Sequence, residues 1–343
     1  MTDTYKIAIV GAATIRGKEL NEALAESPFA SANFTLLDDE SQLGQLEAVG
    51  DEVTFIQRIE PSVFEGMDFV FFAGSPEVTR KHWQAAQKAG AGIIDLSNAL
   101  ENEPGVLVDA PWVEEPRGLN LSTPAVIPAH PVSVALALML GRLQGLGAVA
   151  SASATVLEPA SEYGNAGLDE LHHQTVGLLN FQTPPKAVYD TQVAFNIVSV
   201  VGVEAKADLR GSEARIRRHY TLLADRRLPA VAVQLLHAPV FHGHGISLAV
   251  EFTKSESLGH VEAALSGEHI DVIMGDADSD APNNLNTVGQ SDVMVRVRTA
   301  NGGTEQTPRF WIWASIDNLK FNALNAIASA LELRRLRPQG KVQ

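Results

Sequence analysis

The first third of the chain alternates short apolar runs with helical patterns. A buried-strand pattern at residues 6–10 leads through a glycine-containing turn into a helix whose apolar residues recur at spacings of three and four. Residues 33–39 are predicted as a second strand, and two more apolar strands lie within residues 64–75 and 89–99, on either side of a helical pattern. This alternation predicts a parallel, doubly wound α/β sheet over residues 1 to about 120.

The second half of the chain has a different pattern. Long strand-like runs lie within residues 146–158, 228–253, 292–302 and 309–318, and long connections separate them. Strands of this length with long connections are typical of an α+β domain that contains a large mixed sheet. We see no internal repeat and no low-complexity tract.

Length and charge narrow the possible partners. A chain of 343 residues is longer than one compact core normally occupies, so we expect two domains. The 26 Lys and Arg residues against 41 Asp and Glu residues give a net charge of −15, which opposes binding to nucleic acid and to anionic membranes. No apolar run reaches membrane-spanning length and the chain begins directly with a strand, so we expect a cytoplasmic protein.

The chain contains no cysteine. Disulfides, thiolate metal sites and cysteine nucleophiles are therefore excluded. A phosphorylated substrate would need a locally basic pocket, because the chain as a whole is acidic.

The first chemical motif is the turn GAATIRG, Gly11 to Gly17. In a dinucleotide-binding turn three glycines permit the tight turn, the close approach of the pyrophosphate and the packing of the helix. Here Thr14 occupies the middle position, and its β-branch crowds the point of closest approach. Two interpretations stay open: a weakened dinucleotide site, or an inherited turn that no longer binds a nucleotide.

Acidic residues follow the second predicted strand, at Asp38, Asp39 and Glu40. A carboxylate there accepts the ribose hydroxyls of NAD and repels the 2′-phosphate of NADP. If a cofactor binds, we therefore expect NAD rather than NADP, and weak binding of either.

A histidine-rich segment contains His237, His242 and His244. Alternation along a strand would place His242 and His244 on one face, which raises the possibility of a metal site. No acid or further histidine stands at a recognisable ligand spacing, so we expect no metal and interpret His244 as a general base or its remnant. The acidic segment 274–292 could bind Ca²⁺, but it lacks the glycine and closing glutamate of an EF-hand, so a solvated loop is favoured.

Several motifs, in order over most of the chain, resemble aspartate-semialdehyde dehydrogenases, and in particular their cysteine-less usg-type homologues. The motifs are GAATIRG, IIDLSNALENEPGVLVDAPWVE, EPASEYGNAGLDEL, AFNIV, LLHAPVFHGHGISLAVEF and FWIWASIDNLKFNALNAIASALEL. The resemblance implies a Rossmann-like NAD(P)-binding domain at residues 1–128 and 319–343. It also implies a dimerisation and catalytic-type domain at residues 129–318, and hence a homodimer.

In the family, a cysteine thiolate ahead of a long apolar helix attacks the aldehyde and carries the acyl group to phosphate. The resemblance places that position within Ala129 to Pro131. Ala129 and Pro131 have no nucleophile, and His130 would give a labile acyl-imidazole. Ser133 lies nearby, but an unactivated hydroxyl is a poor substitute for a thiolate.

The resemblance also assigns the surrounding positions. The family's glutamine falls on Glu158, its phosphate-binding arginine on Glu101 and its carboxylate-binding arginine on His237. Other positions are retained: His244 stands at the catalytic histidine, and Glu213 and Arg215 match the substrate-binding Glu-x-Lys. The implied cofactor-binding residues are Gly11, Ala13, Thr14, Ile15, Gly17, Asp38, Asn318 and Lys320, while Asn322 replaces a family glycine.

Two functional hypotheses follow. The first, which we prefer, is a non-catalytic homologue: a homodimer that binds a small ligand or a protein partner. The second is an active NAD(P)-dependent oxidoreductase in which His130, His244 or Glu158 carries altered chemistry on a non-phosphorylated carbonyl substrate.

Overall fold

The computed structural model describes residues 4–39, 44, 46–49, 52–113, 118–225, 227–274, 281–303 and 306–336. The chain divides into two compact units, one of residues 1–129 with 322–343 and one of residues 130–321. The sequence-based division, 1–128 with 319–343 and 129–318, differs slightly: the second observed boundary falls inside the last helix, α7 (Asn318–Leu336). Among the described residues, no helix is long and apolar enough to cross a membrane.

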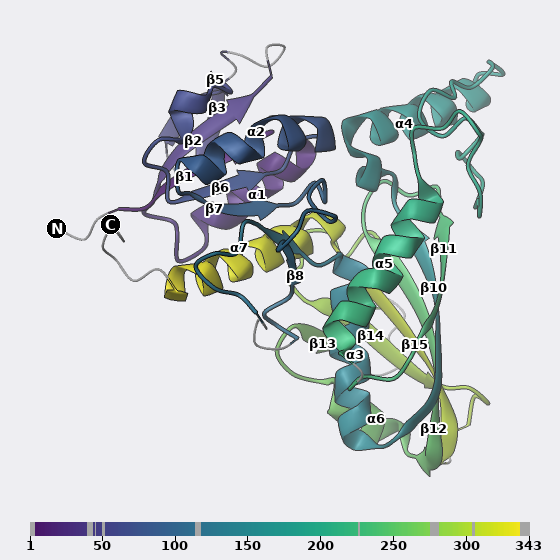
Figure 1. Cartoon of the computed structure of the whole chain (residues 1–343). Coiled ribbons are helices and arrows are strands. Elements are labelled where there is room, and N and C mark those ends of the chain that lie inside the picture. The colour runs from purple at the N-terminus through teal and green to yellow at the C-terminus, as the bar shows by residue number, and fades with distance from the viewer. Residues whose placement is uncertain are drawn as a thin grey trace. The chain divides into compact units, whose positions relative to one another are not determined.

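The first unit contains a seven-stranded parallel sheet with the strand order β5-β2-β1-β6-β7-β9-β8 (Figure 1). Its strands are β1 (Lys6–Val10), β2 (Asn33–Asp38), β5 (Gln57–Arg58), β6 (Phe69–Phe72), β7 (Gly92–Asp95), β8 (Leu107–Asp109) and β9 (Val126–Pro128). A short antiparallel pair, β3 (Leu46–Val49) and β4 (Glu52–Phe55), and the 3₁₀ helix η2 (Pro61–Phe64) complete the unit; we did not predict these from the sequence.

Helices cover both faces of this sheet. The side chains of β1 point alternately into the two cores that these helices form with the sheet. Ile7 and Ile9 point into a core shared with α1 (Ile15–Ala25) and α7, whereas Ala8 and Val10 point into a core shared with α2 (Pro76–Lys88). Strands buried on both faces are the reason that β1, β6 and β7 read as continuous apolar runs. The predicted doubly wound α/β architecture is confirmed.

The second unit contains a six-stranded mixed sheet with the order β11-β10-β12-β15-β14-β13. Pairs β10–β11 and β13–β14 are parallel, and the other pairs are antiparallel. The strands are β10 (Val149–Glu158), β11 (Ala232–His237), β12 (His244–Glu256), β13 (Ile270–Val272), β14 (Val293–Thr299) and β15 (Thr307–Ile316). The predicted mixed sheet is therefore confirmed.

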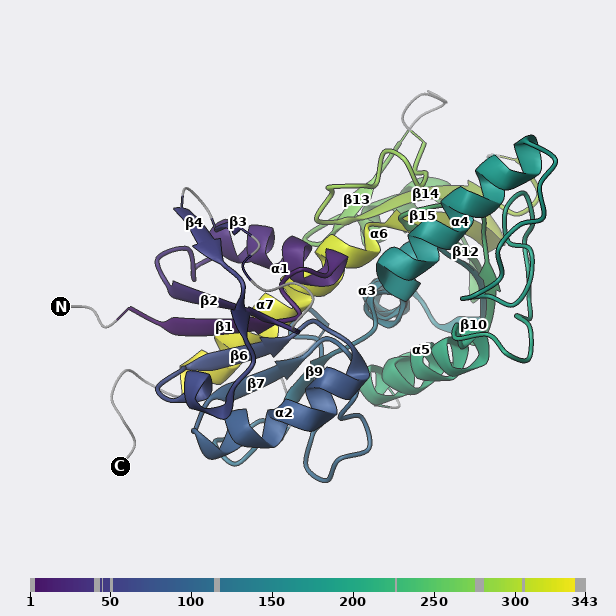
Figure 2. The same cartoon turned by 90° about the horizontal axis from the view of Figure 1, so that it is seen from above.

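Helices α3 (Pro131–Leu146), α5 (Leu209–Ala224) and α6 (Leu258–Leu265) lie together along one face of the mixed sheet (Figures 1 and 2). The 3₁₀ helix η3 (Ala160–Tyr163) and helix α4 (Gly164–Leu179) follow β10. Along β12, buried Ile246, Leu248 and Val250 alternate with partly exposed residues. One face of the sheet is thus covered by helices, and the other is accessible within this chain.

One detail of the predicted strands is wrong. The apolar segment 228–253 is not continuous: β11 ends at His237 and β12 begins at His244. His242 lies in the turn that precedes β12, so it does not share a strand face with His244. Gly243, with φ of +83°, breaks the extended conformation between the two histidines, which explains the difference.

Candidate functional site

The candidate site lies at one end of the mixed sheet in the second unit. Glu158 ends β10, His237 ends β11 and His244 begins β12. β10 and β11 are parallel, and β12 is antiparallel to β10. The last residues of β10 and β11 and the first residue of β12 therefore lie at the same end of the sheet. The register pairs Glu158 with His237 and Leu157 with Gly245. All three side chains, Glu158, His237 and His244, are completely buried.

His130 joins the site from the start of helix α3. Its Nδ1 accepts the N–H of Val132 at 3.2 Å and so caps the helix, with Pro131 in the first turn. The backbone N–H of His130 donates to Nδ1 of buried His219 at 2.9 Å. The ring of His130 contacts that of His244 edge to face, with the centroids 5.6 Å apart.

Glu162, which the sequence analysis did not single out, brings a carboxylate to His244. It lies in η3, and its Oε1 is 3.9 Å from Nε2 of His244. Asn318 holds this carboxylate by donating from Nδ2 to Oε1 at 3.0 Å, and its Oδ1 accepts the N–H of Gly243 at 3.2 Å. Glu162 stands four residues beyond the strand-ending Glu158, and only the turn after Pro159 brings it to the site.

Several buried polar atoms here have no hydrogen-bond partner among the described residues. They are both ring nitrogens of His237 and of His244, Oε1 of Glu158 and the hydroxyl of Tyr189. Buried polar groups are almost always hydrogen-bonded, so atoms of this kind at one place indicate a site for water or a ligand.

Burial sets the protonation of His244. Desolvation lowers its pKa below 6.5, although the negative charges of Glu162 and Glu158 act in the opposite direction. The imidazole is therefore neutral at neutral pH. A neutral imidazole can accept a proton or bind a metal ion.

Two tyrosines enclose the Glu158 side of the site. Tyr163 donates its hydroxyl to Oε2 of Glu158 at 2.8 Å, and that same oxygen lies 3.8 Å from Nδ1 of His237. The ring of Tyr189 lies against that of His237, with centroids 4.6 Å apart. Burial, and next the charge of Glu158, raises the pKa of both phenols, so they remain protonated donors.

Two residues considered from the sequence have structural contacts here. Ser133 is completely buried in α3, and its hydroxyl donates to the carbonyl of Ile216 at 2.8 Å. Glu213 on α5 accepts the N–H of Leu235 at 3.0 Å and so ties the helix to β11. Arg215 is partly buried on the same helix.

The glycine turn of the first unit keeps the tight geometry of a nucleotide-binding turn. Gly11 has φ of +86°, and a Cβ there would stand 2.3 Å from Gly74; a Cβ on Gly17 would stand 2.1 Å from the carbonyl oxygen of Gly11. Thr14 is the N-cap of α1, which starts at Ile15, and its Oγ1 accepts the N–H of Gly17 at 2.9 Å. The turn is thus rigid, with the Gly17 N–H already used.

Asp38 at the end of β2 faces this turn. One carboxylate oxygen accepts the N–H of Ala13 at 2.8 Å, and the other accepts the N–H of Asp39 at 2.9 Å. A negative charge held beside the turn does not fit the 2′-phosphate of NADP, whereas it does not oppose the ribose hydroxyls of NAD. Glu40 lies outside the described residues.

The remaining candidates lie elsewhere. Glu101 is partly buried in a turn of the first unit, after β7. Lys320 is in the first turn of α7, where its N–H donates to Asp317 at 3.1 Å. In the acidic segment 274–292, residues 275–280 lie outside the described residues.

The two units match two family models. Residues 6–130 match the semialdehyde dehydrogenase NAD binding domain, and residues 140–321 match the semialdehyde dehydrogenase dimerisation domain. A USG-1 protein homolog of Azotobacter vinelandii is 33% identical, covering 96% of this chain and 98% of the relative. An aspartate-semialdehyde dehydrogenase of Rickettsia bellii is 26% identical, covering 97% of this chain and 98% of the relative. The structure of a probable aspartate-semialdehyde dehydrogenase from Pseudomonas aeruginosa has a TM-score of 0.82 at 26% identity, covering 97% of this chain and 99% of that chain.

Proposed function

Because this chain belongs to the semialdehyde dehydrogenase family, we propose that it is a member without acyl transfer, which binds a small ligand in the pocket around His244. The observation that carries the proposal is the start of α3. Acyl transfer in the family needs a thiolate there, and the chain has no cysteine. Its residues 129–131 offer only the ring of His130, whose Nδ1 caps the helix.

Ser133, near the start of α3, does not supply a replacement nucleophile either. Ser133 donates its hydroxyl to the carbonyl of Ile216 at 2.8 Å rather than to an imidazole. A serine nucleophile requires an adjacent general base, and this one donates to a backbone carbonyl instead.

The negative charge of the pocket disfavours a ligand that carries a carboxylate. His237 occupies the position where the resemblance places a carboxylate-binding arginine, and its ring faces Glu158 at 3.8 Å. Glu162 adds a second carboxylate beside His244. Two acids with neutral His244 favour a cationic or hydrogen-bond-donating ligand, because a further buried anion would be repelled.

A second candidate function is an oxidoreductase or other enzyme that acts on a non-phosphorylated carbonyl compound. Its support is His244, a buried neutral imidazole whose nitrogens have no partner among the described residues. Such a ring suits a general base.

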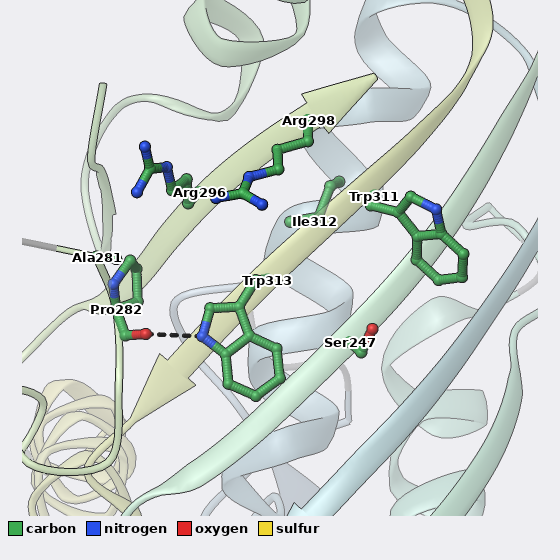
Figure 3. A pocket seen from close by; sticks show the side chains of 8 residues that line it. All are labelled: Ser247, Ala281, Pro282, Arg296, Arg298, Trp311, Ile312 and Trp313. Carbon is green, nitrogen blue, oxygen red and sulfur yellow. Dashed lines mark hydrogen bonds between the residues drawn. The ribbon is translucent and has the colours of Figure 1, made fainter. Parts of the chain in front are cut away.

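The accessible face of the mixed sheet supports a homodimer. Register aligns Ser153, Ala249, Trp311 and Arg298 across four strands, and Trp311 is 49% exposed. Figure 3 shows Trp311 and Trp313 on β15 beside Ser247, around a hollow of about 530 Å³. The side chain of Trp313 donates to the carbonyl of Pro282 at 2.7 Å. Exposed tryptophan with neighbouring arginine is typical of interface centres, so we infer that two copies pair through this face.

The experiment that tests the main proposal is a coupled assay with aspartate semialdehyde, phosphate and NADP or NAD, run in both directions. We expect no turnover above the buffer rate. Turnover within a hundredfold of an active aspartate-semialdehyde dehydrogenase, lost in His244→Ala, would contradict the proposal and favour the second candidate. Thermal shifts with NAD, NADP and small amines then test ligand binding, since a ligand of the native state stabilises it by mass action.

A further inference from the structure

Three side chains of the second unit converge on one point, to which the family resemblance assigns no metal ion. One ring nitrogen of His130, one of His244 and one carboxylate oxygen of Glu162 all lie within 4.8 Å of one another. We propose that these three residues bind a divalent transition metal ion, with Zn²⁺ as the ion that fits best.

The donor set supports zinc. Two imidazoles and one carboxylate are common zinc ligands, and three protein ligands leave a fourth position for water or an oxygen of a bound molecule. Nε2 of His244 and Oε1 of Glu162 are 3.9 Å apart, so joint coordination needs a small contraction. Donor atoms of a tetrahedral zinc site lie on the order of 3.4 Å apart, as bond lengths of about 2.0–2.1 Å require.

His244 is prepared for this role. Its ring is completely buried, and neither nitrogen has a hydrogen-bond partner among the described residues. A ligand lone pair must be unprotonated, and the buried ring is neutral. A metal ion at this point would satisfy an otherwise costly buried atom.

Asn318 supplies a second layer of contacts. Its Nδ2 donates to the oxygen of Glu162 that faces His244, at 3.0 Å, and its Oδ1 accepts from Gly243 next to His244. Side chains that orient metal ligands in this way commonly change affinity by about 10–100-fold when removed. Asn318 is therefore a positioning residue for two of the three ligands.

His130 must rearrange slightly. Its Nδ1 accepts from Val132, which in the neutral ring places the proton on Nε2. Coordination through either nitrogen ends this contact, because the metal takes the Nδ1 lone pair or the proton moves to Nδ1. At 3.2 Å the hydrogen bond is at the long end of the normal range, and the metal–nitrogen bond must offset its loss, which leaves the buried N–H of Val132 without this acceptor.

The metal site lies in the pocket of the proposed function, and it rests on that proposal by giving the pocket a divalent transition metal ion. The test uses the full chain stripped with a chelator, to which Zn²⁺ or Co²⁺ is added. We expect calorimetry to give one ion per chain. We also expect Co²⁺ to produce the strong visible absorption of a tetrahedral site, and Zn²⁺ to raise the melting temperature.

Variants locate the ion. His244→Ala and Glu162→Ala should each weaken metal binding by more than about 100-fold, and Asn318→Ala should weaken it by about 10-fold. Glu162→Gln is the variant of Glu162 that is closest to it in shape. The matched control is His260→Ala, since His260 is an exposed histidine that also lies near a glutamate, Glu256. It should bind as the wild type does.

Two outcomes would overturn the inference: no stoichiometric Zn²⁺ or Co²⁺ on a folded chain, or binding that persists unchanged in both His244→Ala and Glu162→Ala. Circular dichroism of each variant separates lost binding from lost folding; if His244→Ala unfolds, His244→Asn replaces it. The dehydrogenase assay is run on stripped and zinc-loaded protein. Turnover would refute the proposed function while metal binding stands, and absent metal binding would leave the proposed function intact.

Discussion

The imidazole of His237 lies 3.8 Å from the carboxylate of Glu158, and both side chains are completely buried. They are register partners on the parallel strands β10 and β11, so the sheet itself fixes their separation. In this chain a histidine, rather than a permanently charged arginine, lies beside this carboxylate. Neither ring nitrogen of His237 has a hydrogen-bond partner among the described residues, so the two side chains lie close together without a hydrogen bond between them.

The first prediction is that His237 and Glu158 are energetically coupled. A double-mutant cycle with His237→Asn and Glu158→Gln should give a coupling free energy above about 1 kcal/mol, because low local dielectric strengthens a buried pair. Urea unfolding of the four proteins measures it. The control cycle is Arg309 and Glu251, which are closer, at 3.1 Å, but exposed. There we expect less than about 0.5 kcal/mol, and an equal coupling in both cycles would contradict the prediction.

The second prediction concerns Asp109, whose pKa is raised to about 6, chiefly by burial. The pKa of this carboxyl is 3.8 in the unfolded chain and about 6 in the folded chain. Its contribution to stability is therefore fully present below pH 3.8 and is lost as the pH rises through about 6. Asn does not titrate. From pH 4 to pH 7, the free energy of unfolding of Asp109→Asn should therefore rise relative to wild type, by up to about 3 kcal/mol.

Urea unfolding at several pH values measures this difference. The reference variant is Asp169→Asn, at an exposed position on α4. The difference in the free energy of unfolding between wild type and Asp109→Asn could instead stay constant between pH 4 and pH 7. That result would show that the carboxyl is not desolvated.

The third prediction concerns Glu170, a buried carboxylate on α4. It accepts the N–H groups of Val188 at 2.7 Å and Tyr189 at 3.1 Å. Glu170→Ala leaves both donors without a partner and should cost about 2–4 kcal/mol. Glu170→Gln keeps one acceptor oxygen and should cost less. Amide exchange at Val188 and Tyr189 should accelerate in the alanine variant; equal losses in the two variants would argue against the hydrogen bonds as the cause.

The fourth prediction tests the dimer. Light scattering of the wild type at low micromolar concentration should give about twice the chain mass of 36.7 kDa. Trp311→Asp places a charge at the centre of the accessible sheet face and should give monomers. Phe55→Asp, at an exposed aromatic residue of the first unit, should leave the mass unchanged. A monomeric wild type would contradict the proposed interface.

The fifth prediction concerns nucleotides. Since Asp38 holds its negative charge beside the glycine turn, NADP should bind no more tightly than NAD in calorimetry. Asp38→Asn keeps an acceptor for Ala13 while removing the charge, so it should improve NADP binding relative to NAD by about tenfold. A micromolar dissociation constant for NADP in the wild type would show that the carboxylate does not face the nucleotide.

The sequence predicts the two sheets because their strands carry strong local patterns. β1 and β6 are continuous apolar runs, and β12 alternates buried with accessible residues. The pair β3–β4 was missed, since its strands are four residues each and contain polar side chains. Short strands of this kind have little local signal.

The candidate site was harder to predict because its members come together through register and turns. His237 and His244 were singled out from the histidine-rich segment and Glu158 from the family resemblance, but their meeting at one end of the sheet depends on strand pairing. Glu162 was missed although it lies within the motif EPASEYGNAGLDEL, because nothing in that segment predicts that its carboxylate lies beside His244. His242 was misplaced because the positive φ of Gly243 interrupts the extended backbone between the two histidines, so that β12 begins only at His244.

Helix α7 also has a consequence for how the protein is made. Its residues Ala323, Ala326, Ile327, Ala330 and Leu333 belong to the same core as Ile7 and Ile9 of β1. During translation the strand leaves the ribosome first and the helix leaves last, with residues 130–321 made in between. At about 5–20 residues per second this interval lasts on the order of 10–40 s. For that time the part of this apolar core that α7 fills stays open to solvent, and a chain that ended before α7 would keep it open.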